Sequence, residues 1–393
     1  MPNHPTRDDI DLVSGEFWGR NPHEEMAWMR AHAPVYWDGQ VWAITRYADM
    51  KQASSDPATF SNAGGIRPDS GPVAMMIDMD DPAHLRRRKL VNRGYTPRRI
   101  RDREDEVRAT CDAIIDRIAG QSTCDLVWDI AAPLPLAMIA NDLGVEESDR
   151  PQLLEWSDAM LRALTGDMAM AEKAGAAFAG YMAYAADVIA DRKANPRDDL
   201  MSVLCHAEVE GERLTDDEII HESLLILIGG DETTRHVISG GAYQLLVDRA
   251  RWEALRADRT RLPTAVEEML RWVSPIKNMN RTATRDIELG GETIHAGDNV
   301  LLLYPSANRD DAVFDEPNTF DIARTPNDHV AFGFGTHFCL GNSLARVELR
   351  IMFEQLLQRA PDIELVSPQE PEYRPANFIS GYETLPVRVG PVS

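Results

Sequence analysis

The fold of this chain is decided by one stretch, Phe332-Gly333-Phe334-Gly335-Thr336-His337-Phe338-Cys339-Leu340-Gly341. It is rich in glycine and aromatic residues, and its single cysteine stands just before a predicted helix in which Leu344, Val347 and Ile351 recur at helical spacing. At a helix N-terminus the dipole and the free amides favour a thiolate. For a lone cysteine, an inert buried thiol beside a turn is the competing interpretation.

Upstream of this stretch, the sequence predicts one unusually long helix. Thr215 and Glu218 have the spacing of a capping box, and the segment 219–247 then continues without a proline. Residues 224–230 are apolar on all sides, which is typical of a helix that runs through the interior of a protein.

The middle of this helix carries Gly229 and Gly230, followed by Asp231, Glu232 and Thr233. Each glycine inside a helix costs about 1 kcal/mol relative to alanine, so we expect the missing side chains to make room for a flat ligand and a small gas molecule. An acid and an alcohol directly after them are costly in an interior unless they have partners. A helix kink with solvated polar residues is the alternative.

Two further motifs pair charges one helical turn apart. Glu268-x-x-Arg271 can form an ion pair, and the later segment Pro317-x-x-Phe320-x-x-x-Arg324 offers Arg324 as a third partner. Such pairs usually lie on the protein surface and contribute little to stability, which is the competing interpretation. His84-x-x-x-Arg88 places two cationic donors on one helical face, where they suit a pair of carboxylates. A solvated basic face explains the second motif equally well.

Taken in order, these motifs resemble those of the cytochrome P450 family: F-x-x-G-x-(H/R)-x-C-x-G, (A/G)-G-x-(D/E)-T and E-x-x-R. The resemblance implies a mainly α fold with small β-sheets, formed by a single domain over residues 1–393, with the long central helix over haem b. It implies Cys339 as the iron ligand, whose electron donation favours O–O cleavage. Thr233 then donates a hydrogen bond where dioxygen is activated, and Glu232 relays protons. The implied cofactor-binding residues are His84, Arg88, Gly229, Gly230, Arg281, Phe332, His337, Cys339 and Gly341.

Composition narrows the class of protein. The 393 residues carry a net charge of −23, which disfavours nucleic acid and anionic membranes as partners. The four cysteines form no C-x-x-C pair, and no run of eighteen apolar residues or signal peptide is present, so we expect a cytoplasmic monomer without a membrane anchor. Asp38-Gly39 between Val35–Trp37 and Val41–Ile44 predicts a β-hairpin. Further strands are predicted near 286–289, 300–304 and 378–389.

The electrons that such an enzyme needs must come from outside, because the chain has no G-x-G-x-x-G after a strand and no visible reductase segment. We expect a ferredoxin with its ferredoxin reductase. Nine of the residues from Arg86 to Arg103 are Arg or Lys, a local reversal of charge that we interpret as the docking face for an acidic ferredoxin. Insensitivity of turnover to salt and to Arg87→Glu would contradict this.

The expected substrate lining is large, apolar and flexible, which suits a hydrophobic substrate of some length, although ordinary core packing explains any single residue equally well. The candidates are Met75, Met76, Ile77, Leu225, Met279 and Ile379, with Met160, Leu161, Met168, Met170 and Ile226 as further neighbours. Segments 60–69 and 75–84 resemble the mycobacterial cholesterol-catabolic branch of the family. That resemblance implies oxidation of the terminal methyl of a sterol side chain, at C26 or C27 of cholesterol or cholest-4-en-3-one.

Other functions remain open at this point. Terpenoids, fatty acids and macrolides are alternative substrates of such a monooxygenase. A peroxygenase driven by hydrogen peroxide is disfavoured because Glu232-Thr233 is intact. A nitric oxide reductase that takes hydride from a nicotinamide is not excluded. A haem gas sensor would usually carry an output domain, and none is visible.

Overall fold

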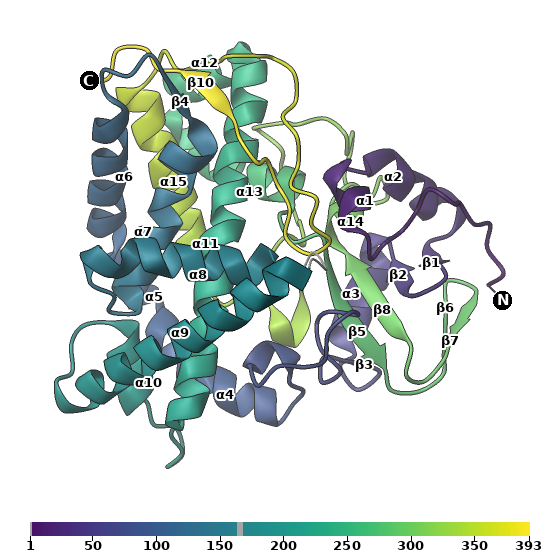
Figure 1. Ribbon diagram of the computed structural model, residues 1–393. Coiled ribbons are helices and arrows are strands. Elements are labelled where there is room, and N and C mark those ends of the chain that lie inside the picture. Colours follow the sequence, from purple (N-terminus) through teal and green to yellow (C-terminus); the bar gives the residue numbers. More distant parts are fainter. Residues whose placement is uncertain (1, 163–167) are drawn as a thin grey trace.

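The computed structural model describes residues 2–162 and 168–393, and it divides into a helical part and a smaller β-rich part. Figure 1 shows the N-terminus on the β-rich side and the C-terminus on the far side of the helical part. The helices are α1 (Gly15–Gly19), α2 (His23–His32), α3 (Tyr47–Ser55), α4 (Ala83–Val91), α5 (Pro97–Asp102), α6 (Glu104–Ile118), α7 (Pro133–Asp142), α8 (Arg150–Arg162), α9 (Met168–Ala194), α10 (Leu200–His206), α11 (Asp216–Val247), α12 (Arg249–Ala257), α13 (Leu262–Val273), α14 (Tyr304–Ala307) and α15 (Asn342–Arg359). The mainly helical fold with small sheets is confirmed.

Helix α11 is the long helix that the sequence predicts. Its capping box is complete, because the Glu218 amide donates to the Thr215 hydroxyl and the Thr215 amide donates to the Glu218 carboxylate. Its 32 residues span about 48 Å, and α7, α13, α15 and α9 pack against it. Figure 1 shows it crossing the middle of the helical part.

The main sheet has five strands in the order β1-β2-β8-β5-β3. The strands of the chain are β1 (Val35–Trp37), β2 (Trp42–Ile44), β3 (Phe60–Ser61), β4 (Thr123–Asp125), β5 (Asn278–Ala283), β6 (Ile287–Leu289), β7 (Glu292–Ile294), β8 (Asn299–Leu303), β9 (Glu364–Leu365) and β10 (Pro386–Arg388). The expected hairpin is present, but Trp37 pairs with Trp42, so its loop has four residues instead of two. Asp38 Oδ1 stabilises this loop by accepting the amides of Gln40 and Val41.

Two strand predictions need correction. The sequence analysis did not predict β5, whose residues Asn-Met-Asn-Arg-Thr-Ala lack the β-branched enrichment that predicts a strand. Within 378–389 only β10 is a strand, and Ile379 forms a single bridge with Ile276. The physical reason is that among the described residues 378–385 meets other segments only in single bridges, at Ile379 and Tyr382, so no ladder forms.

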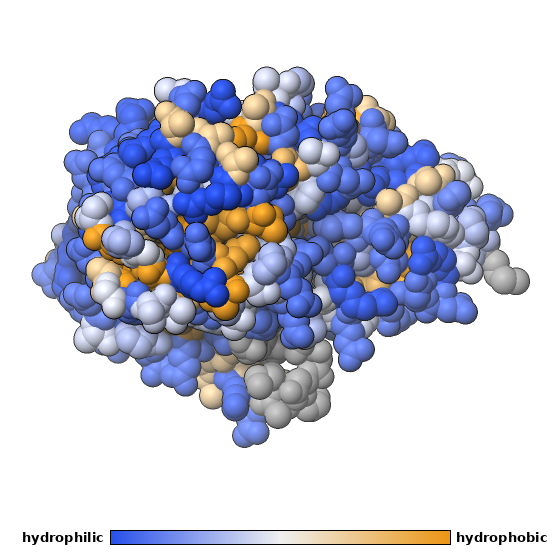
Figure 2. All heavy atoms as spheres, turned by 90° about the horizontal axis from the view of Figure 1, so that it is seen from above, coloured by the Kyte–Doolittle hydropathy of each residue, from blue (hydrophilic) through white to orange (hydrophobic). Residues whose placement is uncertain are grey.

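The surface agrees with the acidic composition. Figure 2 shows one face of the molecule covered mostly by hydrophilic side chains, with hydrophobic ones gathered in patches over the helical part. Among the described helices, none combines the length and the apolar character that crossing a membrane requires.

Candidate active site

The cysteine stretch forms a tight loop that needs its glycines. Gly333 and Gly335 have φ of +71° and +78°, a left-handed conformation that other residues rarely adopt. A Cβ on Gly335 would also lie 2.2 Å from the Ser54 carbonyl oxygen. The Cys339 amide donates to the Phe332 carbonyl over 2.9 Å, which closes the loop directly before α15.

The sulfur of Cys339 lies where a metal ion would stabilise it. Burial raises the pKa of its thiol, against hydrogen bonds from the Gly341 and Asn342 amides and the positive charges of Arg88 and Arg346. A bound metal cation adds the charge that keeps such a sulfur deprotonated. Among the described residues no group of three or more His, Cys, Asp or Glu is placed to hold a metal ion by itself. A single cysteine thiolate is the kind of ligand that a protein supplies to haem iron.

Beside this loop, two histidines hold buried ring nitrogens without partners. The rings of His84 and His337 lie 4.0 Å apart, and Nε2 of each has no hydrogen bond. Burial lowers the pKa of His84, and it lowers the pKa of His337 to about 3. His84 Nδ1 lies 3.2 Å from Asp81 Oδ1, so Nε2 of this ring can donate a hydrogen bond only when the ring is protonated. Two buried Nε2 atoms without partners fit a site that an anionic group such as a haem carboxylate approaches, and its negative charge would favour the protonated rings.

The two candidate arginines lie differently. Arg88 donates to the Phe338 carbonyl within the cysteine loop. Arg281 on β5 is buried and donates over 2.8 Å to the Asn280 carbonyl, with Tyr304 nearby. Burial lowers the pKa of both guanidinium groups, which still stay charged. The positive charges of Arg88 and Arg281 thus both act on His337.

One face of α11 is accessible although the rest of its middle is buried. Leu225, Ile228, Gly229 and Thr233 share this face, and a Cβ on Gly229 would meet nothing within 4 Å. The Thr233 hydroxyl donates to the Gly229 carbonyl over 2.8 Å, which fixes its oxygen on the same face. The open space beside Gly229 is compatible with its predicted role of leaving room for a ligand, which stays a prediction.

Gly230 has a different role from the one that the sequence predicts. A Cβ at this position would lie 2.5 Å from Cδ1 of Ile139 on α7. The missing side chain therefore lets α7 and α11 pack closely, and it does not make room for a cofactor.

Glu232 is buried among positive charges. Arg235 Nη2 lies 2.8 Å and His236 Nε2 3.4 Å from its Oε1, and Arg374 donates to the same oxygen. Burial opposes ionisation, but the nearby His236 and the positive charges of Arg374 and Arg235 lower the pKa of Glu232 to about 2. In this arrangement Glu232 is ionised near neutral pH.

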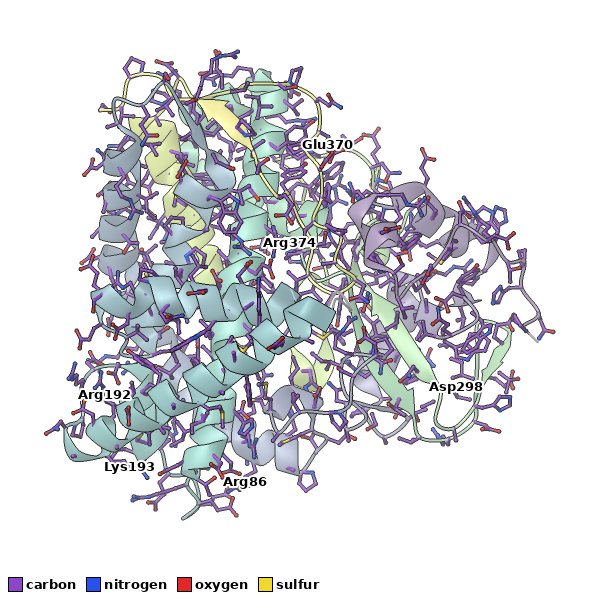
Figure 3. All side chains as sticks on the ribbon, viewed as in Figure 1. Arg86, Arg192, Lys193, Asp298, Glu370 and Arg374 are labelled. Atoms are coloured by element: carbon purple, nitrogen blue, oxygen red, sulfur yellow. The ribbon has the colours of Figure 1, made fainter. Side chains whose placement is uncertain are left out.

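Arg374 links this acid to other elements. It also lies 3.5 Å from Asp158 of α8 and 3.1 Å from Glu383 of the C-terminal segment. Figure 3 shows Arg374 on that segment, against α11. The sequence analysis missed Arg374, because no local pattern marks a residue that meets its partner 142 positions away.

Glu268 and Arg271 form a fully buried ion pair, so the surface interpretation is wrong. The guanidinium donates two bonds of 2.7 Å to the carboxylate, and Arg324 Nε donates a third over 3.1 Å. Arg271 also donates to the carbonyls of Asn308, Pro317 and Thr319. The pair therefore ties α13 to the segment that leads toward the cysteine loop.

Comparison with known proteins agrees with this geometry. The family model described as cytochrome P450 matches residues 107–361.

This chain belongs to the cytochrome P450 family.

Its curated relatives include two mycobacterial enzymes of one name. It is 52% identical over 386 residues to a steroid C26-monooxygenase of Mycolicibacterium smegmatis, covering 97% of this chain and 96% of the relative. It is 50% identical over 384 residues to a steroid C26-monooxygenase of Mycobacterium tuberculosis, covering 96% of each. The chain is therefore a P450 monooxygenase, an oxidoreductase with haem-thiolate iron that uses O2, a redox partner and a hydrophobic substrate.

Solved structures show the same fold. CYP109E1 from Bacillus megaterium in complex with testosterone matches with a TM-score of 0.86 and 34% identity, over 94% of this chain and 99% of that one. CYP108D1 from Novosphingobium aromaticivorans matches with a TM-score of 0.89 and 32% identity, over 99% and 100%.

In this P450, the candidate pocket residues belong to two apolar clusters. Ile379 and Met279 pack with Phe378, Ile66 and Ile276. The other cluster contains Met75, Met76, Ile77, Leu225, Ile226 and Met160. Ile228 of α11 contacts both clusters, so they adjoin on the accessible face of that helix. The side chains of Leu161, Met168 and Met170 lie outside the described residues.

Four members of this lining were not predicted: Ile66, Ile228, Ile276 and Phe378. Ile228 could have been found, because it is three residues after Leu225 and therefore on the same helical face. The other three come from loops and a strand end, where periodicity gives no signal.

The basic segment of this P450 is largely neutralised, which corrects the docking interpretation. Arg87 is buried between Glu218 and Glu222, and Arg103 lies between Glu106 and Asp142. Arg86, Lys89, Arg98 and Arg99 also have a carboxylate within 4 Å. Arg87→Glu would therefore disrupt a buried ion pair, so it does not test docking.

Proposed function

We propose that this P450 hydroxylates the terminal methyl, C26 or C27, of the side chain of cholesterol or cholest-4-en-3-one. The observation that carries the proposal is the identity of 52% over 97% of the chain to a relative named steroid C26-monooxygenase. The large apolar residues on both sides of Ile228 support it, because a sterol offers mostly apolar surface to such a wall.

We further propose how the chain holds haem b. Cys339 supplies the thiolate, His84, His337, Arg88 and Arg281 face the propionates, and Phe332, Gly229 and Gly341 allow close approach of the ring. A haem bound through a thiolate activates dioxygen for insertion into a C–H bond. Gly341 supports this assignment, since a Cβ there would meet nothing within 4 Å.

Glu232 and Thr233 have separate tasks in this proposal. The Thr233 hydroxyl lies on the accessible face of α11, where it donates to the Gly229 carbonyl, and rotation away from that carbonyl would let it donate to a ligand instead. Glu232 is the proposed proton relay, and this task requires its carboxylate to move away from Arg235 and Arg374, because in the ion pair its pKa of about 2 is too low to hold a proton near neutral pH.

A ferredoxin supplied by its reductase is the proposed electron donor, and one copy of the chain is the proposed functional unit. The basic residues of the 86–103 segment that remain free to attract an acidic partner are fewer than the sequence suggests, and Arg93 and Arg101 are exposed among them. Arg93→Glu and Arg101→Glu should slow ferredoxin-driven reduction most at low salt. Arg117→Glu, exposed on α6, is the matched control.

The decisive experiment is a titration of the purified holoenzyme with sterols, fatty acids and terpenes, followed by mass spectrometry of the products. We expect cholest-4-en-3-one to shift the Soret band to shorter wavelength and to yield a terminally hydroxylated product. No shift with any sterol would overturn the assignment.

A methyl-branched lipid is the second candidate substrate. The chain is 39% identical over 408 residues to a methyl-branched lipid omega-hydroxylase of Mycobacterium tuberculosis. A methyl-branched fatty acid in the same titration distinguishes the two candidates. A haem gas sensor would give no product in either case.

A further inference from the structure

Glu267, the neighbour of the buried Glu268, joins both ends of the cysteine loop to α13. Arg346, which follows the loop on α15, donates to it through Nε over 2.7 Å and Nη2 over 2.8 Å. His329, which precedes the loop, lies with Nε2 3.0 Å from the same carboxylate. We call Glu267, His329 and Arg346 the loop anchor.

The loop anchor also contacts the loop itself. Arg346 Nη1 donates over 2.9 Å to Asn342 Oδ1, and Asn342 Nδ2 donates over 2.7 Å to the Cys339 carbonyl. The guanidinium carbon of Arg346 lies 4.6 Å from the centre of the Phe332 ring. A chain of contacts therefore leads from the Glu267 carboxylate to the backbone of the cysteine.

The protonation of the loop anchor is fixed. The Ala331 amide donates to His329 Nδ1 over 3.2 Å, so that nitrogen is the acceptor and Nε2–H donates to Glu267. Burial opposes ionisation of Glu267, but its hydrogen bonds from His329 and Arg346 lower its pKa to about 2. The carboxylate thus holds two donors that arrive from opposite sides of the loop.

We propose that Glu267 is a positioning residue for the haem ligand: it holds the two ends of the loop at a fixed separation and so keeps the Cys339 sulfur in register with the iron. The proposal rests on the assignment of Cys339 as the ligand. The physical reason is that a bidentate arginine–carboxylate pair fixes orientation as well as distance. Without it, Arg346 and His329 no longer share a partner, and the loop can shift so that the sulfur leaves the metal.

The proposed effect on the position of Cys339 differs from the small gain in stability that any partly exposed ion pair gives. The side chains of Arg346 and Glu267 are 35% and 28% exposed, and such a pair contributes about 0–1 kcal/mol to stability. The chain offers a matched pair one turn further along α15, where Arg350 lies 2.9 Å from Glu104 of α6 with exposed fractions of 30% and 41%. The Arg350–Glu104 pair does not contact the cysteine loop in any recorded hydrogen bond or ion pair of the described residues.

The experiment follows the reduced, carbon-monoxide-bound holoenzyme without substrate or redox partner. The wild-type protein shows the long-wavelength Soret band that gives the family its name, and loss of the thiolate converts it to the short-wavelength form. Glu267→Gln, which keeps the shape but removes the charge, should convert about tenfold faster than wild type. Arg346→Lys keeps the positive charge but loses the two-pronged hydrogen bonding of the guanidinium. Its long-wavelength form should convert faster than that of wild type, but by less than in Glu267→Gln. Glu104→Gln and Arg350→Lys should convert at the wild-type rate.

Rates are compared at equal distances below each variant's melting temperature, so that general destabilisation does not count. Equal rates for Glu267→Gln and Glu104→Gln under that comparison would overturn the proposal. If Glu267→Gln does not fold, Arg346→Lys against Arg350→Lys decides in the same way. A wild-type protein without the long-wavelength band would overturn the ligand assignment and this proposal together, whereas equal rates overturn the positioning role alone.

Discussion

Two buried glutamates of this P450 each meet two arginines, yet their surroundings differ. Glu268 and Arg271 have side chains that are 0% exposed, and no atom of Glu268, Arg271 or Arg324 is left without a partner. Around Glu232, which is 1% exposed, Arg235 Nε and Nη1 and both ring nitrogens of His236 have no hydrogen bond. The nearby Asp231 Oδ1 is also unpartnered.

The difference is what we would expect if the Glu268 group is structural and Glu232 has the proposed role in proton transfer. Buried polar atoms without partners are costly, and proteins keep few of them. In the Glu268 group every buried side-chain donor has a partner, which suits a structural role. The Glu232 group retains donors and acceptors without partners next to the accessible face of α11, and this supports the proposed proton path.

The largest expected effect is the loss of unfolding free energy when the Glu268–Arg271–Arg324 group is broken. Glu268→Ala leaves Arg271 and Arg324 buried without their carboxylate, which costs about 3–5 kcal/mol of unfolding free energy. Chemical denaturation followed by circular dichroism measures this loss. Glu253→Ala, which removes the exposed partner of Arg249, should stay within about 0.5 kcal/mol of wild type. A loss below 1 kcal/mol for Glu268→Ala would show that the burial of this pair has little energetic weight.

Removal of the negative charge of Glu232 should affect catalysis more than folding. Glu232→Gln keeps the shape but cannot accept a proton, so product formation should fall by about 100-fold. Measurement of product per electron consumed, with melting temperature and carbon-monoxide spectrum as controls, separates the two effects. Turnover within twofold of wild type would remove Glu232 from the proposed proton path.

Alanine substitutions at Gly229 and Gly230, the two glycines before Glu232, should change the stability of the apoprotein differently. Gly230→Ala places Cβ 2.5 Å from Cδ1 of Ile139, so the end of that side chain must move, and this offsets part of the gain of about 1 kcal/mol in helix propensity. Gly229→Ala meets open space, so helix propensity should stabilise the apoprotein by up to about 1 kcal/mol. Thermal unfolding of both apoproteins checks the order, and equal melting temperatures would contradict it.

A third buried glutamate shows what happens where no arginine donates to the carboxyl. Burial raises the pKa of Glu348 on α15 to about 8, with Arg103 opposing the shift and Asp142 and Glu106 adding to it. The folded protein then holds a proton that the unfolded chain loses near pH 4.5, so the unfolding free energy falls as pH rises from about 4.5 to 8.

Glu348→Gln removes this proton and should reduce the loss of stability between pH 5 and pH 8 by about 1 kcal/mol or more. Thermal unfolding across that pH range measures the change. The exposed Glu147→Gln is the control and should leave the pH dependence unaltered. A pH dependence that is identical in wild type and Glu348→Gln would place the ionised carboxylate in the folded state.

The sequence by itself determined the elements whose signals are local. The capping box of α11, the glycines with positive φ around Cys339 and the period of α15 each depend on residues within a few positions of one another. The order of the motifs then identified the family, and with it Glu268–Arg271–Arg324 as one group. These features are encoded locally because backbone geometry and helical spacing are short-range properties.

Only the tertiary structure decided which groups meet across the fold. It placed Arg374 on Glu232, Ile139 against Gly230, and His329 and Arg346 on one carboxylate, and it cancelled most of the basic segment with acids from α11 and its neighbours. It also decided the direction of pKa shifts, since burial lowers the pKa of His84 and raises that of Glu348 to about 8. Charge pairing and desolvation depend on distance in space, and a sequence does not state that distance.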